Sequence, residues 1–497
     1  GLVMKYTSTR NSKVEISASQ AIVKGISDDG GLFVPSSFPI LSEKDFEDLI
    51  ALDYPARVAK ILSLYMDEFS FDELLVYASK AYSRFDGDVC PVVKVEDGLF
   101  MLELWHGPTC AFKDMALTLL PYLLLASKQK LGITDKTLIL TATSGDTGKA
   151  ALEGFKDVDG TQVVVFYPSE GVSEMQRMQM VTQKGKNLHV FGIKGNFDDA
   201  QTAVKRIFTD EDVINTLKCK GIEMSSANSI NWGRLAPQIA YYVSAYCDLV
   251  DAEEISLGDE VEFVVPTGNF GDVLAGYYAY RMGLPVKKFI IASNANNVLT
   301  DFFNTGVYNA KRDFYKTMSP SMDILVSSNL ERLIYELFDR DDEKVRKLYS
   351  DLKIKGKFEI NLNEVDISKF EAGWADEEDT KNAIATFFDL DDYIMDTHTA
   401  VAASVYNDYS CETDDETTAI IVSTANPYKF PVDVLCAIGG REKDPYKAIM
   451  KLFSLTALDC PESIYELQGA KEIHTRVIDR SETKKVVLEV ADEMSRE

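Results

Sequence analysis

Runs of continuous Val, Ile and Leu, separated by stretches of helical periodicity, constrain the fold of this sequence more than any other feature. The runs that we expect to form strands are 137–141, 163–167, 261–265, 288–292 and 418–423. Strands that are apolar on both faces are typical of parallel sheets, because crossover helices cover both sides. The sequence therefore predicts an α/β architecture of parallel sheets flanked by helices.

The overall charge narrows the partners of the protein. A formal net charge of -27 argues against nucleic acid and anionic membrane as partners. The longest apolar run, around 115–126, is too short to span a bilayer. We therefore expect a small-molecule substrate, and an anionic substrate has to be held by a local positive site.

Cysteine and histidine usage bears on location and metal binding. Seven cysteines are scattered singly, and no basic, apolar leader opens the sequence, so we expect a reducing, cytoplasmic location. With four histidines and no clustered Cys/His pattern, no metal site is predicted.

Changes of pattern along the 497 residues predict four segments. Capping-box pairs at Ser42 and Ser70 indicate a mostly helical N-terminal unit, and 92–104 is typical of a hairpin about Asp97-Gly98. Two acidic runs bracket a polar, helical insertion. The predicted segments are the N-terminal domain 1–95, the α/β core 96–338 with a small subdomain at about 125–200, the insertion 339–395, and a return to the core with a C-terminal tail at 396–497.

Lys113 follows a Gly-Pro turn and precedes a strongly apolar helix. A lysine that is kept in an apolar pocket has a lowered pKa and can act as a Schiff-base nucleophile. The alternative is a lysine whose stem lies on the helix surface while its ammonium reaches water. Residues near Lys113 do not decide between these interpretations.

Two glycine-rich turns, 143–151 and 266–272, follow buried strands and precede helices. Glycines allow tight turns that expose backbone N–H groups at a helix N-terminus, where an anion is stabilised. Each turn can also need glycine for its geometry alone. A Walker loop is excluded because Thr143 and Ala150 occupy required positions, and no acidic residue completes a dinucleotide fingerprint after Gly271.

A candidate Schiff-base lysine and a glycine turn for a phosphate monoester are what pyridoxal phosphate requires. Thr424, at the end of the last buried strand, is a candidate to hydrogen-bond the pyridine nitrogen. It can equally be a turn former at the end of a strand.

Six motifs together resemble the threonine synthase family, in its long bacterial and fungal subgroup. They are HGPTCAFKD (106–114), TATSGDTGKAA (141–151), SINWGRLAPQ (229–238), PTGNFGD (266–272), DTHTAVA (396–402) and STANPYKFP (423–431). The resemblance implies the tryptophan synthase β-subunit-like fold, known as fold type II, with pyridoxal phosphate as cofactor. It also implies conversion of O-phospho-L-homoserine and water to L-threonine and phosphate, the last step of threonine biosynthesis.

The resemblance also implies roles for particular residues. Lys113 is the expected catalytic residue and forms the Schiff base. The expected cofactor-binding residues are Lys113, Gly268, Asn269, Phe270, Asp272 and Thr424, although we interpret Asp272 more readily as a helix N-cap. The expected substrate-binding residues are Ser144, Gly145, Asp146, Thr147, Ser229, Asn231 and Arg234, with Lys149 a weaker candidate. His398 is interpreted as a structural histidine.

Three other functions are compatible with the sequence. A phospho-lyase on the same fold releases 2-ketobutyrate without hydrating the substrate. A serine/threonine dehydratase is less favoured, because the residues predicted to bind the substrate phosphate would then have no role. A non-catalytic protein binds pyridoxal phosphate or a metabolite as a sensor.

For the oligomeric state of the protein, we expect a monomer or a weak homo-oligomer.

Overall fold

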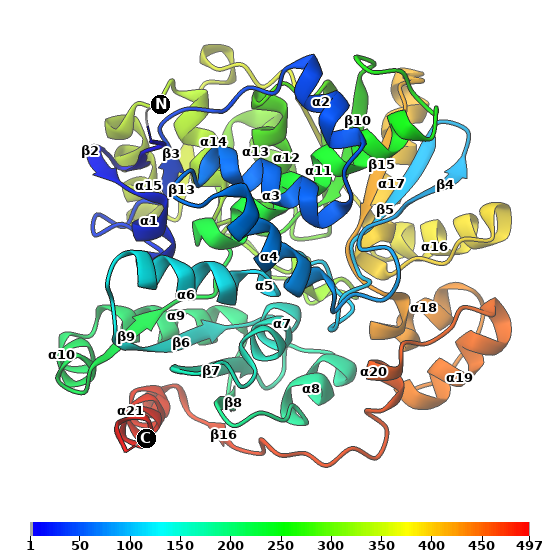
Figure 1. Cartoon of the computed structure of the whole chain (residues 1–497). Coiled ribbons are helices and arrows are strands. Elements are labelled where there is room, and N and C mark those ends of the chain that lie inside the picture. The colour runs from blue at the N-terminus through cyan, green and yellow to red at the C-terminus, as the bar shows by residue number, and fades with distance from the viewer. Residues whose placement is uncertain (1–2, 497) are drawn as a thin grey trace.

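Two parallel sheets form the framework of the chain in its computed structural model, which describes residues 3–496 (Figure 1). The larger sheet has the order β14-β11-β10-β15-β5-β4. Its strands are β4 (Val92–Glu96), β5 (Leu99–Glu103), β10 (Val261–Pro266), β11 (Val286–Ser293), β14 (Phe370–Trp374) and β15 (Ala419–Ser423). Neighbours run parallel except β4, which is antiparallel to β5, so the predicted hairpin is confirmed.

The smaller sheet has the order β16-β8-β7-β6-β9, and all its neighbours run parallel. Its strands are β6 (Lys136–Ala142), β7 (Thr161–Pro168), β8 (Leu188–Ile193), β9 (Ile222–Ser225) and β16 (Val477–Ile478). The five runs predicted as strands are β6, β7, β10, β11 and β15. Strands β8, β9, β14 and β16 had not been predicted.

Helices cover the two sheets, and the buried strands lie in two hydrophobic clusters. Around the larger sheet lie α11 (Trp232–Asp251), α12 (Gly271–Arg281), α13 (Val298–Thr305), α14 (Leu330–Leu337) and α17 (Thr397–Thr413). Around the smaller sheet lie α7 (Asp146–Phe155), α8 (Glu174–Val181), α9 (Phe197–Thr209), α10 (Glu211–Cys219) and α21 (Thr483–Ser495). The expected α/β fold is confirmed.

The N-terminal part combines helices with a small antiparallel sheet of order β2-β1-β3. Its elements are β1 (Tyr6–Ser8), β2 (Asn11–Ile16), α1 (Ala18–Lys24), β3 (Phe33–Pro35), α2 (Glu43–Ile50), α3 (Tyr54–Tyr65) and α4 (Phe71–Tyr82). Ser42 and Ser70 cap α2 and α4 in reciprocal capping boxes, as their spacing predicts.

The apolar stretch after Lys113 forms two helices instead of one. These are α5 (Asp114–Leu117) and α6 (Leu120–Lys130). Pro121 explains the break, because a proline inside a helix removes a donor and its ring clashes with the carbonyl four residues earlier. That earlier residue is Leu117, where α5 ends. The break leaves Lys113 at the start of a helix of only four residues.

The remaining elements change how the predicted segments are connected. They are β12 (Val307–Asn309), η1 (Pro320–Met322), α15 (Asp342–Lys355), β13 (Lys357–Glu359), η2 (Leu362–Glu364), α16 (Glu377–Asp391), η3 (Pro427–Lys429), α18 (Pro431–Ala437), α19 (Pro445–Thr456), α20 (Glu462–Tyr465) and η4 (Arg480–Glu482). The predicted insertion contains β14, which is an edge strand of the larger sheet. The C-terminal tail returns to the smaller sheet, where β16 and α21 join its hydrophobic cluster. The domain limits at 95, 338 and 395 stay predictions.

Within residues 3–496, no helix is long and apolar enough to cross a membrane. The same residues contain no group of three or more His, Cys, Asp or Glu side chains placed to hold a metal ion.

Candidate active site

A pocket lies where the ends of the two sheets meet, and it gathers many of the predicted site residues. Its empty volume is about 460 Å³. The predicted residues that line it are Lys113, Asp146, Gly268, Asn269, Phe270, Asp272 and Thr424. Carboxyl ends of parallel strands are where α/β folds bind ligands, and this pocket adjoins the ends of β6, β10 and β15.

Lys113 is buried in this pocket, with 8% of its surface exposed. The loop before it is held by backbone contacts to the segment after β15: Phe112 donates to the Thr424 carbonyl at 2.8 Å, and Ala111 bridges to Ala425. Burial, followed by the nearby Arg234 guanidinium, lowers the pKa of Lys113 to about 7. Lys113 has no ion pair with any described residue, and its Nζ lies 4.4 Å from the centre of the Phe112 ring. Its environment therefore favours the uncharged, nucleophilic amine.

The turn after β10 exposes the N-terminus of α12 to the pocket. Phe270 is the N-cap and has a φ of 73°, and the Asn269 side chain accepts a hydrogen bond from Gly271 N at 2.9 Å. At Gly268 a Cβ atom would lie 2.9 Å from the Ser321 carbonyl oxygen, so only glycine fits there. The interpretation of Asp272 as the N-cap was wrong, because Phe270 in the left-handed region starts the helix and moves Asp272 into its first turn.

Asp272 is held instead by two tyrosines of α11. The hydroxyls of Tyr241 and Tyr242 both donate to Asp272 Oδ1, the second at 2.8 Å, while Oδ2 is buried with no hydrogen-bond partner among the described residues. Burial outweighs these hydrogen bonds and raises the pKa of Asp272 to about 6. The carboxyl group of Asp272 therefore carries a proton at mildly acidic pH.

The turn after β6 has a different construction. Gly145 has a φ of 133°, and the Thr143 hydroxyl accepts hydrogen bonds from the N–H groups of Gly145 and Gly148 at 2.9 and 2.7 Å. Asp146 is buried and forms an ion pair with Lys429. Ser144 lies on a neighbouring hollow instead of the pocket, and Thr147 is half-buried and absent from the pocket lining.

The three residues predicted to bind substrate near the start of α11 separate in the structure. Asn231 caps α11, donates to the Ile22 carbonyl at 3.0 Å and lies outside the pocket lining. Ser229 is within 3.5 Å of the Ser328 hydroxyl. Arg234 is 1% exposed, and its Nη1 donates to the Ala227 carbonyl at 2.9 Å. Its Nε has no hydrogen-bond partner among the described residues, and burial lowers its pKa to about 10.

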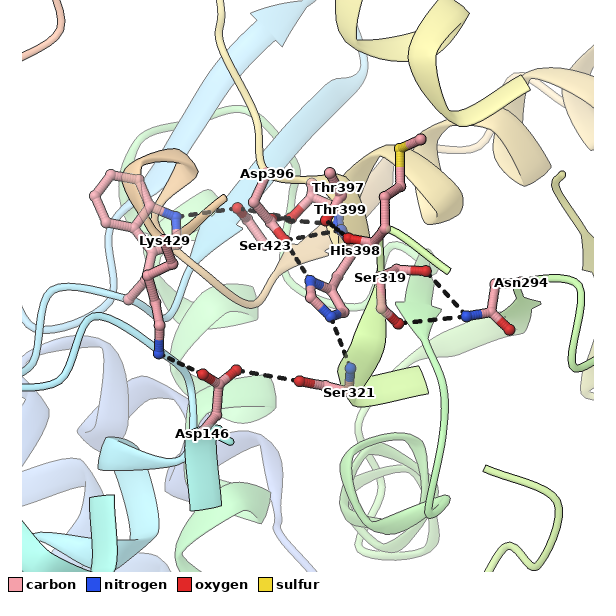
Figure 2. A network of polar contacts seen from close by, with 12 residues as sticks. Asp146, Asn294, Ser319, Ser321, Asp396, Thr397, His398, Thr399, Ser423 and Lys429 are labelled. Carbon is pink, nitrogen blue, oxygen red and sulfur yellow. Dashed lines mark hydrogen bonds and ion pairs between the residues drawn. The ribbon is translucent and has the colours of Figure 1, made fainter. Parts of the chain in front are cut away.

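Two lysines and a histidine complete the polar surroundings. Lys149 contacts Gln183 and Glu153 and does not line the pocket. His398 lines the pocket, but Nδ1 lies 2.8 Å from Asp396 Oδ2 and Nε2 accepts from Ser321 N at 3.2 Å. Both ring nitrogens are thus engaged, which supports a structural histidine. Figure 2 shows how Lys429, Asp146, Ser321, His398 and Asp396 follow one another in one polar network.

The site fits pyridoxal phosphate by its own chemistry. Lys113 offers an amine that burial keeps reactive, and the turn of Gly268 to Phe270 offers backbone donors at a helix N-terminus for a phosphate. Thr424 lies on the same pocket, where its hydroxyl can meet a pyridine nitrogen.

Residues 92–351 match the family model described as pyridoxal-phosphate dependent enzyme, in agreement with this geometry. The chain therefore belongs to the pyridoxal-phosphate-dependent enzymes of fold type II, and its cofactor is pyridoxal phosphate. Residues 5–82 match the model for the threonine synthase N terminus, and residues 399–487 match that for the threonine synthase C-terminal region. The chain belongs to the threonine synthase family.

Individual relatives support this assignment. A threonine synthase from Pseudomonas aeruginosa is 35% identical, over 86% of this chain and 89% of that protein. Human threonine synthase-like 1 is 39% identical over 85% of this chain, which spans only 58% of that relative. The crystal structure of pyridoxal-phosphate-bound threonine synthase from Brucella melitensis has a TM-score of 0.87 at 34% identity, covering 99% of this chain and 100% of that one. Threonine synthase from yeast has the same TM-score at 32% identity, with 99% of each chain covered.

Proposed function

We propose that this protein is a threonine synthase, which converts O-phospho-L-homoserine and water to L-threonine and phosphate. The observation that carries the proposal is a buried cation close to Lys113, the Arg234 guanidinium, which has no carboxylate partner among the described residues. An unpaired buried cation is costly, so a site that keeps one is suited to anionic ligands. A substrate and a cofactor that both carry phosphate supply such ligands.

Lys113 is the group suited to move protons during the reaction. Pyridoxal phosphate, when bound, supplies an electron sink for negative charge at the carbon that bears the amino group. With a pKa of about 7, the Lys113 amine can take the proton from that carbon and later return a proton to another carbon of the substrate. Acid–base efficiency is greatest when the pKa of the group lies near the working pH.

Arg234 is suited to hold the phosphate group that leaves the substrate. A guanidinium can donate two parallel hydrogen bonds to a phosphate, and in Arg234 the buried Nε is still without a partner among the described residues. A fixed donor in a site without water stabilises a leaving phosphate without reorganisation. The turn at Gly145, at the N-terminus of α7, is suited to the substrate carboxylate.

Lys113→Ala tests the proposal. We expect the variant to lose turnover and the visible absorbance that borohydride removes from the wild-type protein. Lys128→Ala, which removes another buried lysine outside the pocket, is the matched control and keeps that absorbance. A Lys113→Ala protein that retains both properties contradicts the assignment.

Product analysis on O-phospho-L-homoserine separates the proposal from its alternatives. Threonine with an equal amount of phosphate is the expected result. Release of 2-ketobutyrate in place of threonine identifies a phospho-lyase, and a protein that binds the cofactor without releasing phosphate is a binding protein. This comparison matters because the human relative is named only threonine synthase-like.

Arg234→Gln tests the binding of the substrate phosphate. We expect kcat/KM to fall by about 10²- to 10³-fold, as for the loss of one fixed donor to a developing charge. Cofactor absorbance remains, because the cofactor turn lies at Gly268 to Phe270 on another helix. An unchanged kcat/KM shows that another group holds the leaving phosphate.

A further inference from the structure

The ion pair between Lys429 and Asp146 is buried beside the pocket. The Lys429 side chain is 0% exposed and that of Asp146 is 5% exposed. Lys429 Nζ also donates to the Thr109 carbonyl at 3.3 Å, in the loop that leads to Lys113. Lys429 does not line the pocket, whereas Asp146 does. Figure 2 shows Lys429 in direct contact with Asp146, through which it is connected to the pocket.

Asp146 presents a difficulty for the binding of an anionic substrate. It is the first residue of α7, at the turn that is suited to a substrate carboxylate. Two carboxylates at one helix N-terminus repel each other, and burial strengthens the repulsion because the dielectric constant is low. A substrate carboxylate can bind there only if the charge of Asp146 is balanced.

The contacts of Asp146 supply that balance. Lys429 lies against Oδ1, to which Gln176 Nε2 also donates at 3.1 Å, and the Ser321 hydroxyl donates to Oδ2 at 3.2 Å. Burial alone would raise the pKa of Asp146, but the Lys429 ammonium outweighs burial and lowers that pKa to about 2. Both carboxylate oxygens are thus turned to the protein, and the charge is matched by one cation.

These partners also come from separate parts of the chain. Asp146 belongs to α7, Gln176 to α8, Ser321 to η1 and Lys429 to η3 after β15, so four segments meet at one carboxylate. Asp146 is thereby fixed in position as well as balanced in charge.

We propose that Lys429 is a positioning residue that neutralises Asp146 and fixes the turn at Gly145, so that the N–H groups at the start of α7 that do not bond Thr143 can receive the carboxylate of an amino-acid substrate. The inference rests on the proposed function in one respect, that the substrate is an α-amino acid. The titratable groups that face Asp146 are Lys429, His398 and Lys113.

Lys429→Met is the test, because methionine keeps the apolar stem and removes the charge. We expect KM for O-phospho-L-homoserine to rise at least tenfold at pH 8 with a smaller change in kcat. The rise is less at pH 6, because Asp146 without Lys429 is protonated more readily. The visible absorbance of the cofactor is unchanged. The Lys429→Arg protein, which keeps the charge, recovers most of the wild-type KM.

The double variant Lys429→Met/Asp146→Asn gives the deciding result. If the unbalanced charge of Asp146 causes the loss, its removal restores KM to within about threefold of the wild type. An equal or larger KM in the double variant, or an unchanged KM in Lys429→Met, overturns the proposal. If Lys429→Met does not fold, Lys429→Gln, which removes the charge and keeps a polar amide beside Asp146, takes its place and is judged by the same KM outcomes.

Binding of L-threonine to the holoenzyme, followed by the cofactor spectrum, makes the same comparison without turnover. A wild-type protein that binds L-threonine but does not convert O-phospho-L-homoserine contradicts the proposed function alone, and the variants then test Lys429 by the dissociation constant. A wild-type protein that binds no amino acid overturns both.

Discussion

The two glycine turns of the site look alike in sequence and differ in electrostatics. Each follows a buried strand, opens a helix and carries an aspartate in the first turn of that helix, Asp146 in α7 and Asp272 in α12. Both side chains are at most 5% exposed. Nevertheless the pKa of Asp146 falls to about 2, whereas that of Asp272 rises to about 6.

The difference lies in the partners and not in burial. Asp146 has an ammonium at its carboxylate, and Asp272 has two tyrosine hydroxyls, which are neutral donors. Hydroxyl donors do not offset the cost of burying a charge, and a contacting cation does. The turn whose aspartate stays ionised, that of Asp146, is also the one that forms an ion pair with Lys429 of η3.

Lys429→Met removes the cation that distinguishes the surroundings of Asp146 from those of Asp272. We expect this substitution to have the largest effect on the stability of the protein. Loss of one partner of a buried ion pair costs about 3–5 kcal/mol, because the other charge is left uncompensated. In the wild type, the depressed pKa of Asp146 stabilises the fold above about pH 4 and this contribution is lost as the pH falls toward 2. Urea unfolding at pH 7 and at pH 4 should show a smaller loss for the variant at the lower pH.

The control for this measurement is Lys353→Met, which removes an exposed lysine from α15. We expect its free energy of unfolding to change by less than about 0.5 kcal/mol. A Lys429→Met protein as stable as this control contradicts the interpretation that the ion pair sets the difference between the turns.

Replacing the aspartate by asparagine in the two turns should change the free energy of unfolding at pH 8 in opposite directions. Asp272 has a raised pKa, so its contribution to stability is present below about pH 4 and is lost as the pH rises through 6. Asp272→Asn should therefore stabilise the cofactor-free protein by about 2–3 kcal/mol at pH 8 and by little at pH 4. Asp146→Asn should destabilise it at pH 8, because Lys429 then loses its counter-charge. If urea unfolding shows that both substitutions change the free energy of unfolding in the same direction, the proposed electrostatic difference between the two turns is wrong.

Local sequence was sufficient for much of the fold, and it supplied many of the residues that line one pocket. The apolar runs predicted β6, β7, β10, β11 and β15, because a strand buried on both faces has to be apolar throughout. The burial of Lys113 agrees with the reactive interpretation left open by its neighbours. The six motifs supplied the family, which the comparisons show independently.

What could not be predicted depends on distant residues. Lys429 lies in a motif quoted for the family, yet its partner Asp146 is 283 positions away, and nothing local marks it as buried. Asp272 was misinterpreted because its role depends on tyrosines of α11 and on the left-handed backbone of Phe270. Strand β16 has two residues and is recognisable only by its pairing with β8.

The hydroxyls of Tyr241 and Tyr242 should have the smallest effect on stability. They sharpen the comparison of the two turns, because they donate to Asp272 and not to Asp146. Tyr242→Phe removes one neutral donor from Asp272, so we expect a loss of about 1 kcal/mol and a further rise in the pKa of Asp272. Tyr278→Phe is the control, because its buried hydroxyl has no hydrogen-bond partner among the described residues. In an Asp272→Asn background the loss from Tyr242→Phe should shrink, because a hydrogen bond to a charged group is worth more than one to an amide. An undiminished loss in that double-mutant cycle means that the tyrosine acts through packing and not through the carboxylate.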